Sequence, residues 1–99
     1  MIRGTTPTHT FLVNVDMTDA KIYLTYKQKG RTIVEKTEKD MVVFSDRIVV
    51  DLTQAETLRF TADAPIEMQI RYVKGSGEAS ASEIMTTNIA NVLKQGVIK

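Results

Sequence analysis

Apolar and polar residues alternate along most of the chain with a period of two, which is typical of half-buried β-strands. Ile22, Leu24 and Tyr26 share one face of a segment whose other face is polar, and residues 66–72 repeat the pattern. In residues 31–37 the pattern leaves open whether positions 32 and 34 or positions 33 and 35 face inward. We predict seven strands, over residues 11–15, 21–28, 31–37, 41–44, 47–52, 66–72 and 78–87.

Turn and cap residues separate these segments. Glycine tolerates the positive φ of tight hairpins, so residues 29–30 (Lys-Gly) and 74–77 (Lys-Gly-Ser-Gly) predict hairpin turns. Thr53 is followed three residues later by Glu56, which is the spacing of a helix capping box. A proline at position 65 limits the length of this helix, so we predict one short helical turn over about residues 53–59.

Seven short strands at this spacing predict a sandwich or a small barrel, and the helical turn favours a sandwich, in which the chain crosses between sheets. Cysteine and tryptophan are absent, so the core signature of antibody domains is missing. We expect an all-β, Ig-like, seven-stranded antiparallel β-sandwich with a short C-terminal extension. Its parts are an N-terminal arm (1–7), the sandwich (8–88) and the C-terminal extension (89–99).

The arm and the extension are the candidate contact surfaces. In the extension, Ile89, Val92 and Leu93 have helical spacing, and one isolated amphipathic turn is not stable in water. The extension therefore either packs across the open end of the sandwich or docks onto another subunit. The candidate protein-interface residues are Ile2, Arg3, Ile89, Val92, Leu93, Val97 and Ile98.

Composition supports the strand prediction and limits the classes of function. Thr, Val and Ile make up 32 of the 99 residues, and their stiff side chains favour strands. This length fits one domain, and without cysteine there is neither a disulfide framework nor a thiolate metal site. A net charge of +1 argues against whole-surface capture of nucleic acid, and no apolar run is long enough to span a membrane.

Side chains for catalysis or metal binding are sparse. The lone histidine, His9, lies among threonines, and we interpret it as a surface residue of an arm or an edge strand. Asp16 and Asp19 flank a predicted turn without further acidic neighbours, which favours turn residues over a calcium site. We therefore expect no catalytic residue, no metal and no cofactor, and a protein that is not an enzyme.

Two other binding functions remain as alternatives. Lys27, Lys29 and Arg31 beside Tyr23 resemble the basic and aromatic platform of a single-stranded nucleic-acid-binding barrel. Acidic residues in the following strands offset this positive charge. Lysines at an exposed sheet edge also prevent pairing with other chains, which explains the same residues without nucleic acid. Tyr23 with Thr25 is the candidate platform of a carbohydrate or cell-surface ligand module, and a cross-strand structural pair explains the same residues.

Several segments carry a resemblance to known proteins. The chain opens with Met-Ile-Arg-Gly-Thr-Thr-Pro-Thr and continues into Phe-Leu-Val-Asn-Val at residues 11–15. Residues 49–60 read Val-Val-Asp-Leu-Thr-Gln-Ala-Glu-Thr-Leu-Arg-Phe, and residues 92–98 read Val-Leu-Lys-Gln-Gly-Val-Ile. Together they resemble small proteins encoded in the tail-gene regions of bacteriophages and prophages of Gram-positive gut bacteria. The capped turn and its flanking strands are also similar to the N-terminal Ig-like β-sandwich of phage upper-baseplate proteins.

The resemblance implies a structural or adaptor role. The upper-baseplate module attaches a receptor-binding device to the phage tail, and it has no catalytic residue to carry over. This chain lacks the helical stalk and the receptor-binding part, so the resemblance implies a free-standing adaptor or a minor virion component. Its implied partners are other virion proteins or further copies of itself. The opening residues lack the apolar segment of a secretion signal, so we expect the protein in the host cytoplasm or in the virion.

Overall fold

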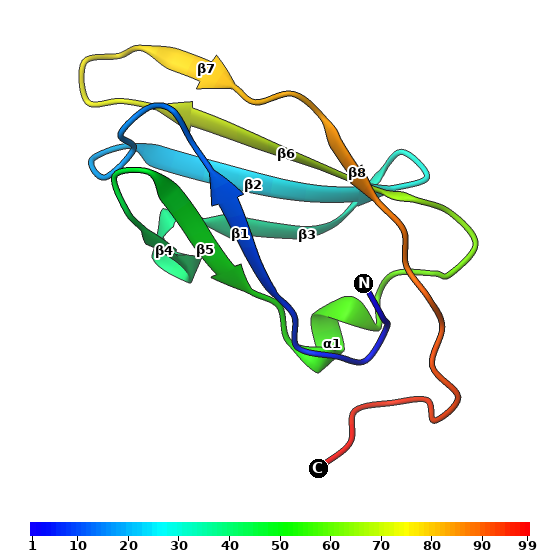
Figure 1. Cartoon of the computed structure of the whole chain (residues 1–99). Helices are drawn as coiled ribbons and strands as arrows, with labels where there is room; N and C mark the ends of the chain where they lie inside the picture. The colour runs from blue at the N-terminus through cyan, green and yellow to red at the C-terminus, as the bar shows by residue number, and fades with distance from the viewer.

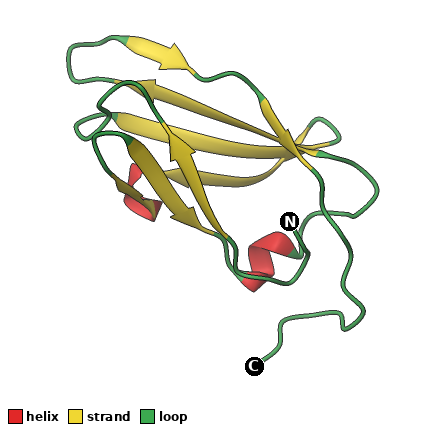
Figure 2. Cartoon of the chain, viewed as in Figure 1, coloured by secondary structure: helices red, strands yellow, loops and turns green.

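Two antiparallel sheets face each other in the computed structural model, which describes all 99 residues (Figures 1 and 2). The smaller sheet contains, in spatial order, β1 (Thr8–Leu12), β5 (Arg47–Asp51) and β4 (Met41–Val43). The larger sheet contains β3 (Arg31–Thr37), β2 (Lys21–Gln28), β6 (Ile66–Val73) and β7 (Ala79–Ala81), and β8 (Met85–Thr87) also pairs with β6. The helical elements are α1 (Gln54–Thr57) and a 3-10 turn (Glu38–Asp40).

The strand order is that of an immunoglobulin-like sandwich. The order β1-β5-β4 corresponds to strands B, E and D of that fold, and β3-β2-β6-β7 corresponds to C′, C, F and G. The predicted Ig-like all-β sandwich is therefore confirmed. In constant-type domains strand A pairs with strand B, whereas here no strand lies on the outer side of β1.

The core consists of the side chains that the alternation placed inward. Ile22, Leu24 and Tyr26 of β2 are fully buried, and they pack against buried residues of β5 and β6. Each large apolar side chain contributes about 1.5–3 kcal/mol when it leaves water. In β3 neither predicted inward pair is right, because a bulge opposite Tyr26 and Lys27 leaves Ile33 unpaired. Val34 is buried and Ile33 packs against the core.

The first strand begins earlier than its apolar pattern predicts. The pattern indicates residues 11–15, but β1 covers Thr8–Leu12. The reason is that its only partner, β5, lies opposite these five residues, with Asp51 paired to Thr8 and Arg47 paired to Leu12. The N–H of Val13 still donates to the carbonyl of Asp46 at 2.9 Å, and the alternation of burial continues to residue 17.

The last strand is divided, so the sandwich has eight strands and the expected number of seven is wrong. β7 pairs Ala81 with Arg71 and β8 pairs Met85 with Met68, so three residues, 82–84, oppose only two on β6. The Oγ of Ser82 accepts the N–H of Ile70 at 3.0 Å, in the place of a backbone carbonyl. A serine side chain therefore stabilises the bulge that separates β7 from β8.

The predicted turns and the helix cap are present. Lys29 and Gly30 have φ values of 55° and 76°, which is the left-handed pair that a tight two-residue hairpin requires. Thr53 and Glu56 form the predicted capping box, with the Glu56 N–H donating to Thr53 Oγ1 at 3.1 Å. The helix itself is one turn long, Gln54–Thr57. None of the helical segments is long and apolar enough to cross a membrane.

Candidate protein-contact surfaces

A groove of about 1060 Å³ opens along the side of the sandwich between β1 and the β7–β8 edge. Phe11 and the loop after β1 form one wall, Ile70 and Tyr72 of β6 form the floor, and residues 80–83 with Met85 form the other wall. Figure 1 shows that β1 and β7 belong to different sheets and lie at the same margin of the sandwich. In an immunoglobulin domain this margin is the position of strand A.

Small side chains on β7 explain why the groove is hollow. Ser80 is paired with Tyr72, and residues 79–82 read Ala-Ser-Ala-Ser, so no large side chain reaches across toward β1. Phe11, Tyr72 and Met85 therefore remain only partly buried, although they pack against the core. The groove thus offers partly buried apolar side chains to any segment that enters it.

The outer edge of β1 is unpaired. The Leu52 N–H donates to the Pro7 carbonyl at 3.1 Å and the Val13 N–H donates to the Asp46 carbonyl at 2.9 Å. Hydrogen-bonded pairs recur at every second residue of an antiparallel ladder, so the odd-numbered residues of β1 bond to β5. The N–H and C=O groups of Thr10 and Leu12 consequently point to the side on which no strand lies.

The charged residues of the groove are acidic. Glu78 and Glu83 line the β7 wall, where Glu78 is exposed, and no lysine or arginine lines the groove. The groove therefore combines an apolar floor, an unpaired backbone edge and a negatively charged rim.

The N-terminal arm and the start of the extension pack on each other. Ile2 and Ala90 form a parallel β-bridge, in which the Arg3 N–H donates to the Ala90 carbonyl at 3.0 Å and the Ala90 N–H donates to the Met1 carbonyl at 2.9 Å. Ile89, expected among the interface residues, is buried in the core instead. Ile89, Val92 and Leu93 have helical spacing, but residues 88–99 contain no helix, and the N–H and C=O of Ala90 bond to the arm instead.

Arg3, another expected contact residue, is engaged within the chain. Its Nε donates to the Phe60 carbonyl at 2.7 Å and Nη2 donates to the Leu58 carbonyl at 3.0 Å. Its Nη1 donates to Asn91 Oδ1 at 2.7 Å and to Gln95 Oε1 at 3.0 Å. The guanidinium group thus joins the arm, the extension and the segment after α1, and each of its nitrogens already donates within the chain.

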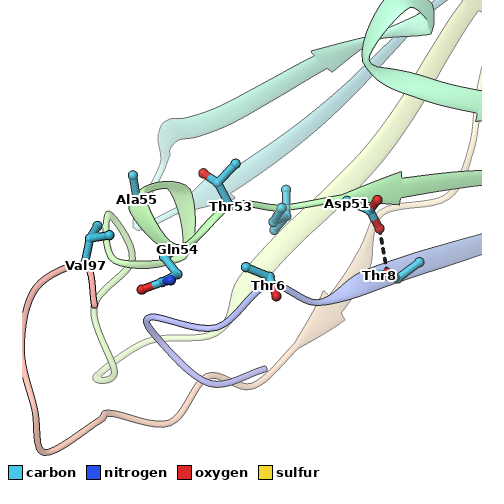
Figure 3. A pocket seen from close by; sticks show the side chains of 8 residues that line it. Thr6, Thr8, Asp51, Thr53, Gln54, Ala55 and Val97 are labelled. Carbon is cyan, nitrogen blue, oxygen red and sulfur yellow. Dashed lines mark hydrogen bonds between the residues drawn. The ribbon is translucent and has the colours of Figure 1, made fainter. Parts of the chain in front are cut away.

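Four of the five remaining expected contact residues are accessible. Leu93 is fully exposed, and Ile2, Val97 and Ile98 are each at least half exposed, whereas Val92 is partly buried. Val97 lies beside α1, at a hollow of about 590 Å³ (Figure 3). There Ile98 exchanges two hydrogen bonds with the Gln54 side chain, at 2.9 and 3.2 Å. The Thr8 hydroxyl, farther along the same hollow, donates to Asp51 at 2.5 Å.

His9 lies on the edge strand β1, as one of its interpretations had it, but it is half-buried, so the expected surface exposure is wrong. Its Nδ1 lies 2.7 Å from the hydroxyl of Tyr26, a fully buried residue on the other sheet. Burial lowers the pKa of His9, and the positive charge of the N-terminus lowers it further. No local pattern in the sequence indicates this contact, because the two residues meet only when the sheets face each other.

The carboxylates lie apart from one another. No group of three or more His, Cys, Asp or Glu side chains is arranged to hold a metal ion. Asp16 Oδ1 accepts the Thr18 N–H at 3.0 Å, and this backbone hydrogen bond holds the pKa of Asp16 below its ordinary value. Asp16 is therefore a turn residue in this structure.

Tyr23 lies half-exposed on the outer face of the larger sheet, beside a hollow of about 320 Å³ that Lys21, Thr25 and Arg71 also line. The Thr25 hydroxyl donates to Glu35 at 3.3 Å. Lys29 is paired with Asp63 at 2.7 Å, so the basic hairpin has an acidic neighbour.

Comparison with known proteins gives no relative: no family model, no curated protein and no solved structure matches the chain.

Proposed function

We propose that the chain is a structural or adaptor protein of a phage or prophage tail, that it acts through protein–protein contacts, and that it is not an enzyme. One observation carries the proposal: the unpaired edge of β1 borders a groove with an apolar floor. Unpaired N–H and C=O groups at a sheet edge are a template for an added strand, and an apolar groove beside them gives side chains a place to bind.

Two further features support an assembly role. The sandwich has the Ig-like strand order that the resemblance to upper-baseplate modules implies. The extension presents Leu93, Val97 and Ile98 to solvent, and exposed apolar side chains of this kind are typical of interaction sites. We place the protein in the host cytoplasm before assembly and in the particle afterwards.

The test is detection of the chain in purified particles. Phage or induced prophage particles are separated on a density gradient, and the particle band is examined by mass spectrometry for peptides of this chain. We expect these peptides in constant proportion to those of the tail proteins across the band. An abundant host cytoplasmic protein is the control, because its peptides should decline with purification. A chain that declines in parallel with this control would contradict the proposal.

A second candidate function is binding of a carbohydrate or another cell-surface ligand at Tyr23. The half-exposed ring beside the hollow with Thr25 and Arg71 favours it, because an aromatic face next to polar groups suits a sugar. Retention of the protein on a glycan array, lost in Tyr23→Ala and kept in Phe44→Ala, an exposed aromatic residue outside the hollow, would support this function. Absence of retention of the parent protein would exclude it for the glycans tested.

A further inference from the structure

We propose that the groove between β1 and the β7–β8 edge receives residues 92–98 of a second copy of this chain, so that copies join head to tail. This inference rests on the proposed function, because it names a partner and a surface for the protein–protein contacts.

The acceptor is the unpaired edge of β1. Thr10 and Leu12 direct their free N–H and C=O groups outward, and Leu12 is 81% exposed. An added strand would satisfy these groups and would cover Phe11 and Tyr72 with its own side chains. It would occupy the position of the strand A that is missing beside β1.

The donor is the exposed end of the extension. Residues 92–98 lack helix and strand structure, and Leu93, Val97 and Ile98 are exposed. Extended, these seven residues span about 23 Å, which is enough to follow the five residues of β1 and the start of its loop. Within the chain the segment is held by two hydrogen bonds between Ile98 and the Gln54 side chain and by one from Arg3 to Gln95, and Val92 is partly buried, so these few contacts have to break when the segment moves.

The positive charge of the donor complements the negative charge at the rim of the groove. The groove rim carries Glu78 and Glu83 and no basic residue. The donor, residues 92–98, carries Lys94 and no acidic side chain, and Lys99 follows it directly. Complementary charges of this kind favour encounter between the two surfaces and fix the pairing.

The donor has to come from a second copy. β8 borders the groove at Met85, and the chain then runs away from it past Ala90 toward α1, where Ile98 bonds to Gln54. Figure 1 shows the C-terminus beyond α1, at the end of the molecule opposite the turn between β6 and β7. Because groove and donor are different surfaces, the contact is heterologous and generates a ring or a filament.

The experiment measures the mass of the full chain by light scattering over a rising concentration series. We expect masses that grow in multiples of 11.1 kDa. The donor variant combines Leu93→Asp with Val97→Asp, and the acceptor variant is Thr10→Pro, which removes an N–H that bonds to no other strand. Each variant alone should stay monomeric, and their equimolar mixture should stop at two copies. Val42→Asp, an exposed residue of β4, is the control and should assemble like the parent.

A charge-reversal pair keeps the inference testable if Thr10→Pro does not fold. Glu78→Lys with Glu83→Lys should weaken assembly at least tenfold, and a copy with Lys94→Glu and Lys99→Glu should restore it in the mixture. The inference is wrong if the parent is monomeric throughout, if either single variant still assembles, or if the mixtures stay monomeric. A monomeric chain that is nevertheless found in purified particles would overturn this inference and leave the proposed function intact.

Discussion

The hydroxyl of Tyr26, on the larger sheet, lies 2.7 Å from Nδ1 of His9 on the smaller sheet. Tyr26 is fully buried, and its ring packs edge-on against Phe60 with centroids 6.2 Å apart. A buried hydroxyl needs a partner, and His9 is the partner that the structure provides. One polar contact therefore joins the two sheets within an otherwise apolar interface.

Removing the two sides of this contact should have unequal effects. Tyr26→Phe deletes the hydroxyl and leaves half-buried His9 able to bond to water, so we expect a loss of about 1 kcal/mol. His9→Leu leaves the buried hydroxyl without a partner, so we expect a loss of about 2 kcal/mol. Urea unfolding at pH 8 measures both. The double variant should be less destabilised than the two losses added together, and simple additivity would show that the contact contributes nothing.

The lowered pKa of His9 gives the protein a pH dependence of defined sign. Burial holds the pKa below its ordinary 6.5, with the N-terminal charge adding to the effect. As the pH falls below 6.5 the unfolded chain takes up the proton first, so the free energy of unfolding should decrease. This decrease should stop once the pH is below the folded pKa, because both states are then protonated. Between pH 7 and the folded pKa, the free energy of unfolding should change less with pH in His9→Gln than in the parent. An unchanged slope would show that another group causes the pH dependence.

Arg3 should control the order of the segment after β8. It bonds to carbonyl oxygens of Phe60 and Leu58 and to the side chains of Asn91 and Gln95, so Arg3→Met removes four hydrogen bonds. We expect faster amide hydrogen exchange at Ala90 and faster tryptic cleavage after Lys94. Arg71→Met, at an exposed arginine of the larger sheet, is the matched control. Equal exchange and cleavage in the two variants would remove Arg3 from this role.

Which side chains of a strand face inward could be predicted from the sequence, because the alternation depends only on residues that are adjacent in the chain. Burial alternates along β2 and β6 as predicted, and the Lys29–Gly30 hairpin follows from the φ values that glycine tolerates. The break at Ser82 could not be predicted in this way. It depends on a side-chain oxygen that replaces a backbone carbonyl opposite Ile70, a residue twelve positions away.

The candidate site was only partly predictable for the same reason. Leu93, Val97 and Ile98 are exposed and stay predicted contact residues, whereas Ile89 and Arg3 are used inside the fold. The helical spacing of the extension does not produce a helix, and the N–H and C=O of Ala90 bond to the N-terminal arm in a parallel bridge instead. The small residues at 79–82 were the available sign of the groove, and their effect emerges only when β7 is placed opposite β1.

The capped helical turn is tied to the larger sheet by a nearly buried ion pair. Lys36 Nζ lies 2.7 Å from Glu56 Oε2, and the two side chains are only 13% and 16% exposed. Glu56 Oε1 also accepts the Thr53 N–H at 2.9 Å. Burial raises the pKa of Glu56, but the hydrogen bonds from Lys36 and Thr53 outweigh it, so the pKa lies below its ordinary 4.5. The same carboxylate thus serves both the cap and the ion pair.

Lys36→Met should therefore destabilise the protein by about 2 kcal/mol at neutral pH, because it leaves a poorly solvated carboxylate without its charged partner. The stability that Glu56 contributes is present above pH 4.5 and is lost as the pH falls through its folded pKa. Because Lys36 is what lowers this pKa most, the loss of stability on acidification should be smaller in Lys36→Met. Lys29→Met breaks the exposed pair with Asp63 and is the matched control, with nearly unchanged stability. Urea unfolding of the three proteins at neutral and acid pH makes the comparison, and equal losses in the two variants would show that burial of the Lys36–Glu56 pair does not matter.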